Sequence, residues 1–251
     1  MHPVLFRIGS LTIYTYGFFV FLGILAGYLF SLRESLRYGI SQDKISDLIF
    51  WSLLAGLASS RLFYIIINWK YFLEEPLGFI ISGSGFVFYG GLLGGVLTAL
   101  FFIKKRGLPL FKTLDLLSPS LCLGHSIGRI GCFFYGCCYG KPTASFLGMV
   151  FPADSPAGSL QVPVIPTQLI SSFFLLLIFL ILIFTRKRGY FEGKVFVSYI
   201  VLYSVFRFII EFYRADPRGF LGFFSVSQWI SLILLLWGLI FWKKLQRKIN
   251  N

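Results

Sequence analysis

Seven long apolar runs, separated by short stretches rich in lysine and arginine, dominate the chain. Each approaches or exceeds the roughly 20 residues that an apolar helix needs to cross a bilayer. The runs cover approximately residues 11–32, 45–67, 86–103, 114–130, 166–184, 193–212 and 225–242. The fourth ends in a glycine–arginine motif, where the alternatives are an intact helix and a break into a re-entrant segment. The pattern predicts an all-α polytopic membrane protein with about seven transmembrane helices, forming a single integral-membrane domain over residues 1–251.

The basic residues between the runs predict the orientation. Fifteen lie on one side and five on the other. The fifteen are Arg33, Arg37, Lys44, Lys104, Lys105, Arg106, Lys112, Arg186, Lys187, Arg188, Lys194, Lys243, Lys244, Arg247 and Lys248, and the five are Arg7, Lys70, Lys141, Arg214 and Arg218. Because short cytoplasmic loops carry the excess of positive charge, we expect the N-terminus outside and the C-terminus in the cytoplasm. The long segment 131–165 then faces outward, and ordered loops of this length are frequently functional.

Composition supports the bilayer as the relevant solvent. The chain is 57% hydrophobic and only 13% charged, against roughly 25% charged residues in soluble domains. The net charge of +13 raises the question of nucleic acid. The basic residues cluster in short loops instead, where they act as topology signals and contact anionic lipid, so we expect no nucleic-acid partner. The N-terminus lacks the basic region and cleavage site of a signal peptide, and we interpret the first run as a retained helix.

Three arginines fall inside or at the edge of apolar runs, where a charge is costly and usually marks a functional site. Arg207 and Glu211 are four residues apart on one helix and share a face, so they can pair for structure or for function. Arg214 continues that face near the outer end. Arg129 has no acid nearby in the sequence, and we expect it to bind an anion such as a lipid phosphate. The sequence does not say whether Arg61 reaches the same site.

Glycine, histidine and cysteine residues supply further candidates. The GGLLGG stretch at 90–95 holds two small-xxx-small pairs, which favour tight helix packing, although a groove for an acyl chain would have the same pattern. His125 lies one turn before Arg129 and is either a neutral general base or a structural histidine.

The four cysteines are Cys122, Cys132, Cys137 and Cys138. Their spacing fits no standard zinc pattern, so we expect no metal and no cofactor; a disulfide on the outer side or small buried side chains remain the alternatives.

No Ser-His-Asp order, P-loop or dinucleotide-binding fingerprint occurs in the chain. An enzyme built from these residues would position a lipid phosphate and an incoming nucleophile, and it need not supply a nucleophile of its own.

The motif GRIGCFFYGCCYGKP at 128–142 resembles the signature of the bacterial prolipoprotein diacylglyceryl transferases. Four other blocks are similar to that family: PVLFRIG with Tyr16-Gly17, Phe88-Tyr89-Gly90-Gly91-Leu92, Pro166-Thr167-Gln168-Leu169, and Arg207 to Arg214 with Ser227-Gln228-Trp229. The resemblance implies a multi-pass enzyme of the bacterial inner membrane. In that family the lipobox cysteine of an exported preprotein attacks the glycerol carbon of phosphatidylglycerol, glycerol phosphate leaves, and a diacylglyceryl thioether forms.

The chemistry of that reaction suits residues of this chain. Arg129 and Arg207 would hold the phosphate, because a leaving phosphate needs positive charge where its own charge develops. The resemblance implies that Tyr16 lines the same site and that Gly140 closes its loop. We expect His125 to assist, so the catalytic candidates are Arg129, Arg207, His125 and Tyr16. The candidates for substrate binding are Arg129, Gly140, Glu211, Arg214, Tyr89, Gly90, Gly91 and Arg61. The expected partners are phosphatidylglycerol, exported preproteins with a lipobox cysteine, and membrane lipids.

Five positions depart from the family pattern. Tyr89 stands in place of histidine, Cys132 of asparagine, Cys137 of glutamate, Ile165 of histidine and Ser171 of glutamate. The chain is then either a divergent member that performs the same reaction with assistance from His125, or a paralogue that transfers a lipid moiety to another acceptor. A non-catalytic carrier of lipids or small solutes, and a thiol redox protein using Cys137 and Cys138, are alternatives of another class.

Overall fold

A computed structural model describes residues 3–9, 11–81, 85–187, 191–216 and 219–250. The chain divides into two compact units. The larger unit comprises Met1–Ser31 and Leu114–Asn251, and the smaller unit comprises Leu32–Thr113. Arg188 and Arg218, which entered the charge comparison, lie outside the described residues.

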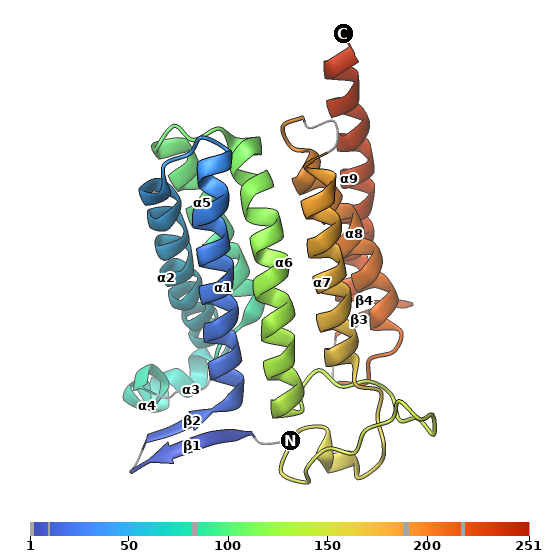
Figure 1. The fold of residues 1–251 in the computed structure, drawn as a ribbon. Coiled ribbons are helices and arrows are strands. Elements are labelled where there is room, and N and C mark those ends of the chain that lie inside the picture. The colour runs from blue at the N-terminus through green and yellow to red at the C-terminus, as the bar shows by residue number, and fades with distance from the viewer. Residues whose placement is uncertain (1–2, 10, 82–84, 188–190, 217–218, 251) are drawn as a thin grey trace. The chain divides into compact units, whose positions relative to one another are not determined.

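Helices make up most of both units (Figure 1). The larger unit contains β1 (Val4–Ile8), β2 (Leu11–Tyr14), most of α1 (Thr15–Arg37), most of α6 (Leu110–Tyr135), the 3₁₀ turn η1 (Gly158–Leu160), α7 (Thr167–Thr185), α8 (Lys194–Glu211), β3 (Phe220–Leu221), β4 (Phe224–Ser225) and α9 (Val226–Asn250). The smaller unit contains α2 (Gln42–Ile67), α3 (Trp69–Glu74), α4 (Pro76–Ile81) and α5 (Phe88–Lys105). Among the described residues, β1 pairs with β2 and β3 pairs with β4, each in an antiparallel sheet of two strands.

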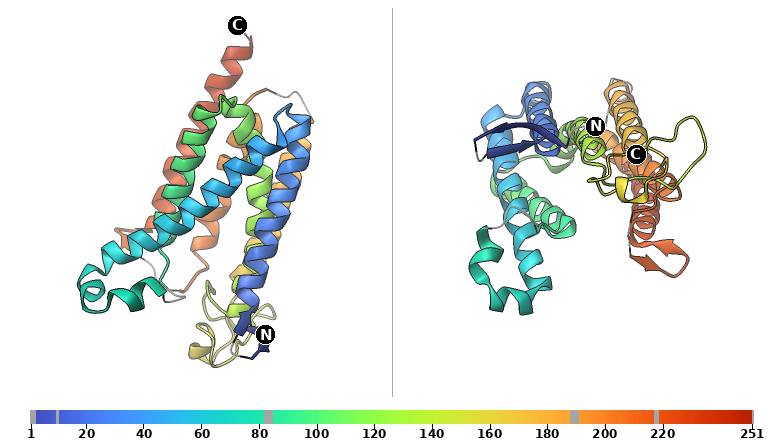
Figure 2. Two further views of the ribbon diagram at one scale, coloured as in Figure 1. Left: turned by 90° about the vertical axis from the view of Figure 1, so that its left-hand side faces the viewer. Right: turned by 90° about the horizontal axis from the view of Figure 1, so that it is seen from below.

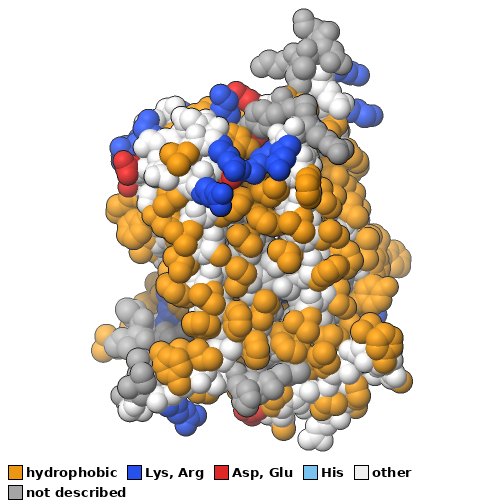
Figure 3. Space-filling model, in the orientation of Figure 1, with side chains coloured by type: hydrophobic (Ala, Val, Ile, Leu, Met, Phe, Trp, Pro, Cys, Tyr) orange, Lys and Arg blue, Asp and Glu red, His pale blue; other side chains and the backbone are white. Residues whose placement is uncertain are grey.

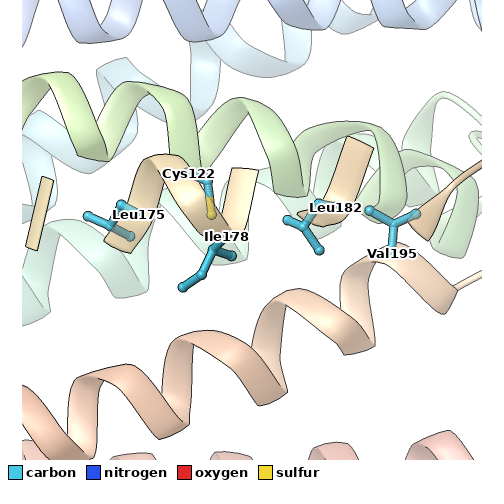
Figure 4. Packing of buried hydrophobic residues seen from close by; sticks show 5 residues of the cluster. All are labelled: Cys122, Leu175, Ile178, Leu182 and Val195. Atoms are coloured by element: carbon cyan, nitrogen blue, oxygen red, sulfur yellow. The ribbon is translucent and has the colours of Figure 1, made fainter. Parts of the chain in front are cut away.

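The larger unit is held together by close helix contacts. A Cβ atom built on Gly23 of α1 would lie 2.5 Å from the carbonyl oxygen of Gly124 in α6, so only glycine permits this approach. Helix α6 also meets α7, where the Ser126 hydroxyl donates to the carbonyl oxygen of Ser172 at 2.8 Å. Figure 4 shows a buried apolar cluster that joins three helices. Its members are Cys122 of α6, Leu175, Ile178 and Leu182 of α7, and Val195 of α8.

A buried carboxylate fixes the start of α8. Asp115 of α6 is fully buried. Its two oxygens accept the backbone N–H groups of Gly193 and Phe196 at 2.7 Å each. A carboxylate at this end of a helix satisfies otherwise unpaired donors and interacts favourably with the helix dipole. Because Asp115 comes from another helix, it sets where α8 begins relative to α6.

In the smaller unit, α2 packs against α5 through small residues. A Cβ on Gly91 would lie 3.2 Å from the carbonyl oxygen of Gly56, and the Ser59 hydroxyl donates to the carbonyl oxygen of Gly90 at 2.9 Å. This contact confirms tight helix packing as a role of the glycine pairs at 90–95. At the end of α2, the short helices α3 and α4 fold back (Figure 2).

The outer surfaces of the helices are apolar. On the face drawn in Figure 3, hydrophobic side chains cover the helices, and lysines and arginines gather mainly near the helix ends. Within the described residues, five helices are long and apolar enough to cross a membrane. They are Thr15–Arg37, Gln42–Ile67, Phe88–Lys105, Thr167–Thr185 and Val226–Arg247. Helix α8 corresponds to a sixth predicted run, but it carries Lys194, Arg207 and Glu211, and α6 carries Asp115, His125 and Arg129.

The structure confirms the mainly helical class, settles one open alternative and changes two details. The fourth run is one continuous helix through Pro119 to Tyr135, without a break at the glycine–arginine motif. The segment that follows it therefore begins at Gly136 and not at 131. The first run starts as a hairpin, because Leu11–Tyr14 pairs with Val4–Ile8, and the helix begins only at Thr15.

Candidate active site

The end of α6 turns sharply and gathers three thiols. Gly136 follows the last helical residue with φ +77°, and its N–H donates to the carbonyl oxygen of Cys132 at 3.0 Å. This left-handed cap is a common way to end a helix. Cys138 also has a positive φ of +62°, which is uncommon for a residue other than glycine. The reversed chain brings the sulfur atoms of Cys132, Cys137 and Cys138 within 4.8 Å of one another.

The first turn of α7 holds this loop in place. The Gln168 side-chain amide donates to the carbonyl oxygen of Cys137, and the Thr167 hydroxyl donates to that of Cys138, both at 2.7 Å. Both side chains are buried. Farther along the loop, the Gly140 N–H donates to the carbonyl oxygen of Ile165 at 2.9 Å. A Cβ on Gly140 would lie 2.7 Å from that same oxygen, so this position requires a glycine.

Arg129 and His125 form a pair on α6. Arg129 Nε donates to His125 Nε2 at 3.2 Å. The accepting Nε2 carries no proton, which makes this imidazole neutral. No carboxylate pairs with Arg129 among the residues that the structure describes. Tyr16 of α1 lies within electrostatic range of Arg129 and of the three thiols. Among the described residues, this guanidinium therefore has no acidic partner and lies within electrostatic range of a phenol.

Arg207 is held from two directions. Its Nη1 pairs with Glu211 Oε2 at 3.0 Å, and its Nη2 donates to the Ser227 hydroxyl at 3.0 Å. The Arg207 side chain is 15% exposed and that of Glu211 is 3% exposed. Ser225 donates from its hydroxyl to Glu211 Oε1 at 2.8 Å. Arg207 also lies within electrostatic range of His125. The pair predicted from the i, i+4 spacing is thus confirmed, and it is fixed to the start of α9.

Hydrogen bonds at the start of α9 hold Ser225 in position. The Ser225 N–H donates to Gln228 Oε1 at 3.0 Å, and the Gln228 N–H donates to the Ser225 hydroxyl at 3.2 Å. This reciprocal pair is a capping box, in which two unpaired backbone donors of a helix start are satisfied. The sequence pattern Ser-x-x-Gln at 225–228 was a signal for it.

Arg214 closes the far side of the thiol cluster. It makes two hydrogen bonds of 2.9 Å to the carboxylate of Asp216 and is buried. Burial alone lowers the pKa of Arg214, but the hydrogen bonds to Asp216 and the nearby Cys138 raise it above its ordinary value. The pKa of the Cys138 thiol is lowered, first by hydrogen bonds with Cys132 and Cys137 and also by the charges of Arg214 and Arg129. The sequence interpretation missed Asp216.

Comparison with known proteins identifies the family. A family model described as prolipoprotein diacylglyceryl transferase matches residues 3–243. The chain belongs to the prolipoprotein diacylglyceryl transferase family. It is 40% identical over 240 residues to the phosphatidylglycerol–prolipoprotein diacylglyceryl transferase of Clostridium tetani, covering 95% of this chain and 96% of that protein. It is 39% identical over 243 residues to such a transferase, numbered 2, of Clostridium perfringens (96% and 94%), and 34% identical over 244 residues to that of Shouchella clausii (95% and 88%).

In this member of the transferase family, most of the predicted site residues lie in the larger unit. His125 lies close to both Arg129 and Arg207. Cys138 lies close to both Arg129 and Arg214. Gly140 forms an isolated backbone bridge with Arg214. The structure thus links two sequence blocks, 128–142 and 207–214, through the thiol-bearing loop. The resemblance drawn from the motifs is confirmed by the family match.

The other predicted residues lie in the smaller unit. The Arg61 guanidinium donates to the carbonyl oxygens of Phe79 and of Gly85, the latter at 3.1 Å. It also lies over the rings of Tyr64 and Phe86, 5.6 and 5.5 Å from their centroids. Gly90 and Gly91 contact α2, as described above. Tyr89 is 49% exposed on α5. Arg61 and the two glycines therefore have structural partners inside their own unit.

The smaller unit also has a hollow of about 620 Å³. It is lined by Tyr64, Asn68, Tyr71, Glu74, Glu75 and Phe79. Two carboxylates and no basic residue line it, so it is unsuited to a lipid phosphate.

Proposed function

We propose that this chain transfers the diacylglyceryl group of phosphatidylglycerol to the lipobox cysteine of exported prolipoproteins, with formation of a thioether and release of glycerol phosphate. The names of the relatives support this activity. The observation that carries it is Arg129, a guanidinium in an apolar helix without a carboxylate partner among the described residues. Arg207 lies within electrostatic range of His125, the side chain to which Arg129 donates.

The reaction requires stabilisation of the charge that develops on the leaving phosphate. Arg129 and Arg207 would bind the phosphate oxygens, because the planar guanidinium matches that geometry. Glu211 orients Arg207 and Tyr16 hydrogen-bonds the head group. His125 accepts a hydrogen bond from Arg129, so we assign it to the positioning of that arginine. Gly140 keeps the outer loop close to α7, and Arg214 supports the same loop.

We also propose how the chain crosses the membrane. We propose one integral-membrane domain in the bacterial inner membrane, with seven crossings, the N-terminus outside and the C-terminus in the cytoplasm. The excess of lysine and arginine on one side supports this orientation. Residues 136–165 would then meet exported substrates on the outer side. The proposal does not depend on Tyr89, Arg61, Gly90 or Gly91, which lie in the smaller unit.

Product analysis tests the proposal. The purified protein in phosphatidylglycerol nanodiscs would be given a lipobox peptide, or the same peptide with serine in place of the acceptor cysteine. We expect a diacylglyceryl thioether on the cysteine peptide only, together with glycerol phosphate. A folded protein that binds phosphatidylglycerol but modifies neither peptide would refute transfer to prolipoproteins. Labelled phosphatidylglycerol in native membranes would then identify another acceptor, as expected for a paralogue, or no labelled product, as expected for a carrier.

A further inference from the structure

We propose that Cys132, Cys137 and Cys138 bind one soft divalent metal ion, Zn²⁺ by preference, whose fourth coordination position receives the thiol of the acceptor cysteine. The acceptor part of this inference rests on the proposed function. The metal site itself rests on the thiol cluster.

The geometry suits three thiolate ligands. Tetrahedral zinc with Zn–S bonds of about 2.3 Å places its sulfurs roughly 3.8 Å apart. The three sulfur atoms here lie within 4.8 Å of one another, so a contraction of at most about 1 Å brings them to that arrangement. Side-chain rotation is sufficient for a change of this size. The sequence spacing fits no standard zinc pattern. Those patterns describe structural sites with four protein ligands, whereas a site with an open position needs only three.

The loop is preorganised for this arrangement. Gln168 and Thr167 fix the carbonyl groups of the two adjacent cysteines, and the Gly136 cap fixes the end of the helix that carries Cys132. Cys138 is held at φ +62°, a conformation that glycine would adopt more easily. Backbone strain of this kind persists where the surrounding structure maintains it, and it is concentrated at functional sites.

The surrounding charge fits an anionic metal–thiolate centre. Three thiolates and one divalent cation leave one net negative charge. Arg214 interacts with the Cys138 thiol by hydrogen bonding and charge, and Arg129 is also within electrostatic range. Both cations would offset the net negative charge of such a centre. A disulfide explains the cluster less well, because adjacent Cys137 and Cys138 bridge only with strain and a bridge to Cys132 leaves one thiol over.

In the transfer reaction, the metal would activate the acceptor thiol. A thiol that coordinates zinc loses its proton, here to water, and becomes the thiolate nucleophile. Its sulfur then forms a C–S bond to the glycerol carbon while the C–O bond to phosphate breaks. The electron pair of that bond leaves on the phosphate oxygen near the arginines. The thioether product is neutral and a weak ligand, so it leaves the metal, and no oxidant or reductant is needed.

Cobalt substitution tests the site without relying on activity. The full-length protein in phosphatidylglycerol nanodiscs would be stripped with a chelator and titrated with Co²⁺, whose thiolate charge-transfer absorption reports sulfur ligands. We expect one ion per chain, and at least tenfold weaker binding for Cys132→Ser, Cys137→Ser and Cys138→Ser. Cys122→Ala is the matched control, because Cys122 lies in the apolar cluster on α6. Gel filtration and phosphatidylglycerol binding would establish that each variant is folded.

The outcomes separate the inference from the proposed function. A lipobox peptide that shifts the cobalt spectrum, while its serine counterpart does not, supports coordination of the acceptor thiol. Restoration of glycerol phosphate release by Zn²⁺ after chelation supports its catalytic use. Full peptide-dependent release by a metal-free protein that binds no Co²⁺ overturns the metal site and leaves the proposed function standing. Cobalt binding through the three cysteines without any release overturns the proposed function and supports the site.

Discussion

Glu211→Gln isolates the role of the carboxylate that holds Arg207. The substitution keeps the size of the side chain and can keep an acceptor for Ser225, but it removes the negative charge 3.0 Å from Arg207 Nη1. Both side chains are largely buried, at 3% and 15% exposed. Breaking a buried ion pair from one side costs about 3–5 kcal/mol of stability.

The same change should reduce turnover in the folded protein. An arginine that loses its buried carboxylate partner is held less firmly, and a displacement of about 1 Å costs roughly 10²-fold in rate. We therefore expect kcat/KM for peptide-dependent glycerol phosphate release to fall about 10²-fold at a temperature where the variant remains folded. Thermal unfolding in detergent and initial rates in phosphatidylglycerol nanodiscs would measure the two effects.

Glu34→Gln is the matched control for this variant. Glu34 is also buried, at 2% exposed, and it pairs with Arg37 at 3.0 Å on α1, in a different ion pair. Its loss should lower stability with little change in kcat/KM of the folded protein. If Glu211→Gln is folded and retains kcat/KM within about twofold of the unchanged protein, the positioning of Arg207 by Glu211 is refuted.

Two further predictions concern stability and use paired variants. Asp115→Ala removes two charge-assisted hydrogen bonds to the start of α8 and should lower the unfolding free energy by about 3–5 kcal/mol. The control Asp47→Ala, which removes an exposed ion pair, should cost at most about 1 kcal/mol. Equal losses in chemical denaturation would contradict the capping role. Gly23→Ala places a Cβ against the backbone of Gly124 and should lower the unfolding free energy by about 1–3 kcal/mol. The control Gly128→Ala enters open space and should leave the unfolding free energy unchanged or raise it. The opposite order of melting temperatures would refute the close contact of α1 with α6.

The helical part of the fold was largely predictable because its signal is local. The fifth and sixth apolar runs, 166–184 and 193–212, match Thr167–Thr185 and Lys194–Glu211 within one residue at each end. The hairpin was missed because Leu11–Tyr14 is mostly apolar and continues into the helix with no charged residue, glycine or proline between them. The continuity of α6 was left open because the glycines around Arg129 weaken the local helix preference, which the packing against α1 and α7 overrides.

The site was predictable where spacing decides geometry. The pairing of Arg207 with Glu211 follows from one helical turn. The thiol cluster does not, because the approach of Cys132 to Cys138 depends on two positive φ angles and on hydrogen bonds from α7. The capping of α8 by Asp115 depends on a contact 78 residues away in the chain, which no local pattern encodes.

Arg129 is the residue on which the account depends most, and its replacement is the most direct test. Glycerol phosphate release would be measured in phosphatidylglycerol nanodiscs with a lipobox peptide for the unchanged protein, Arg129→Ala, and the control Arg106→Ala, whose arginine is exposed and paired with Asp47 in the smaller unit. We expect peptide-dependent release that falls at least about 10²-fold in Arg129→Ala and is unchanged in Arg106→Ala. A folded Arg129→Ala protein with full peptide-dependent turnover would contradict it.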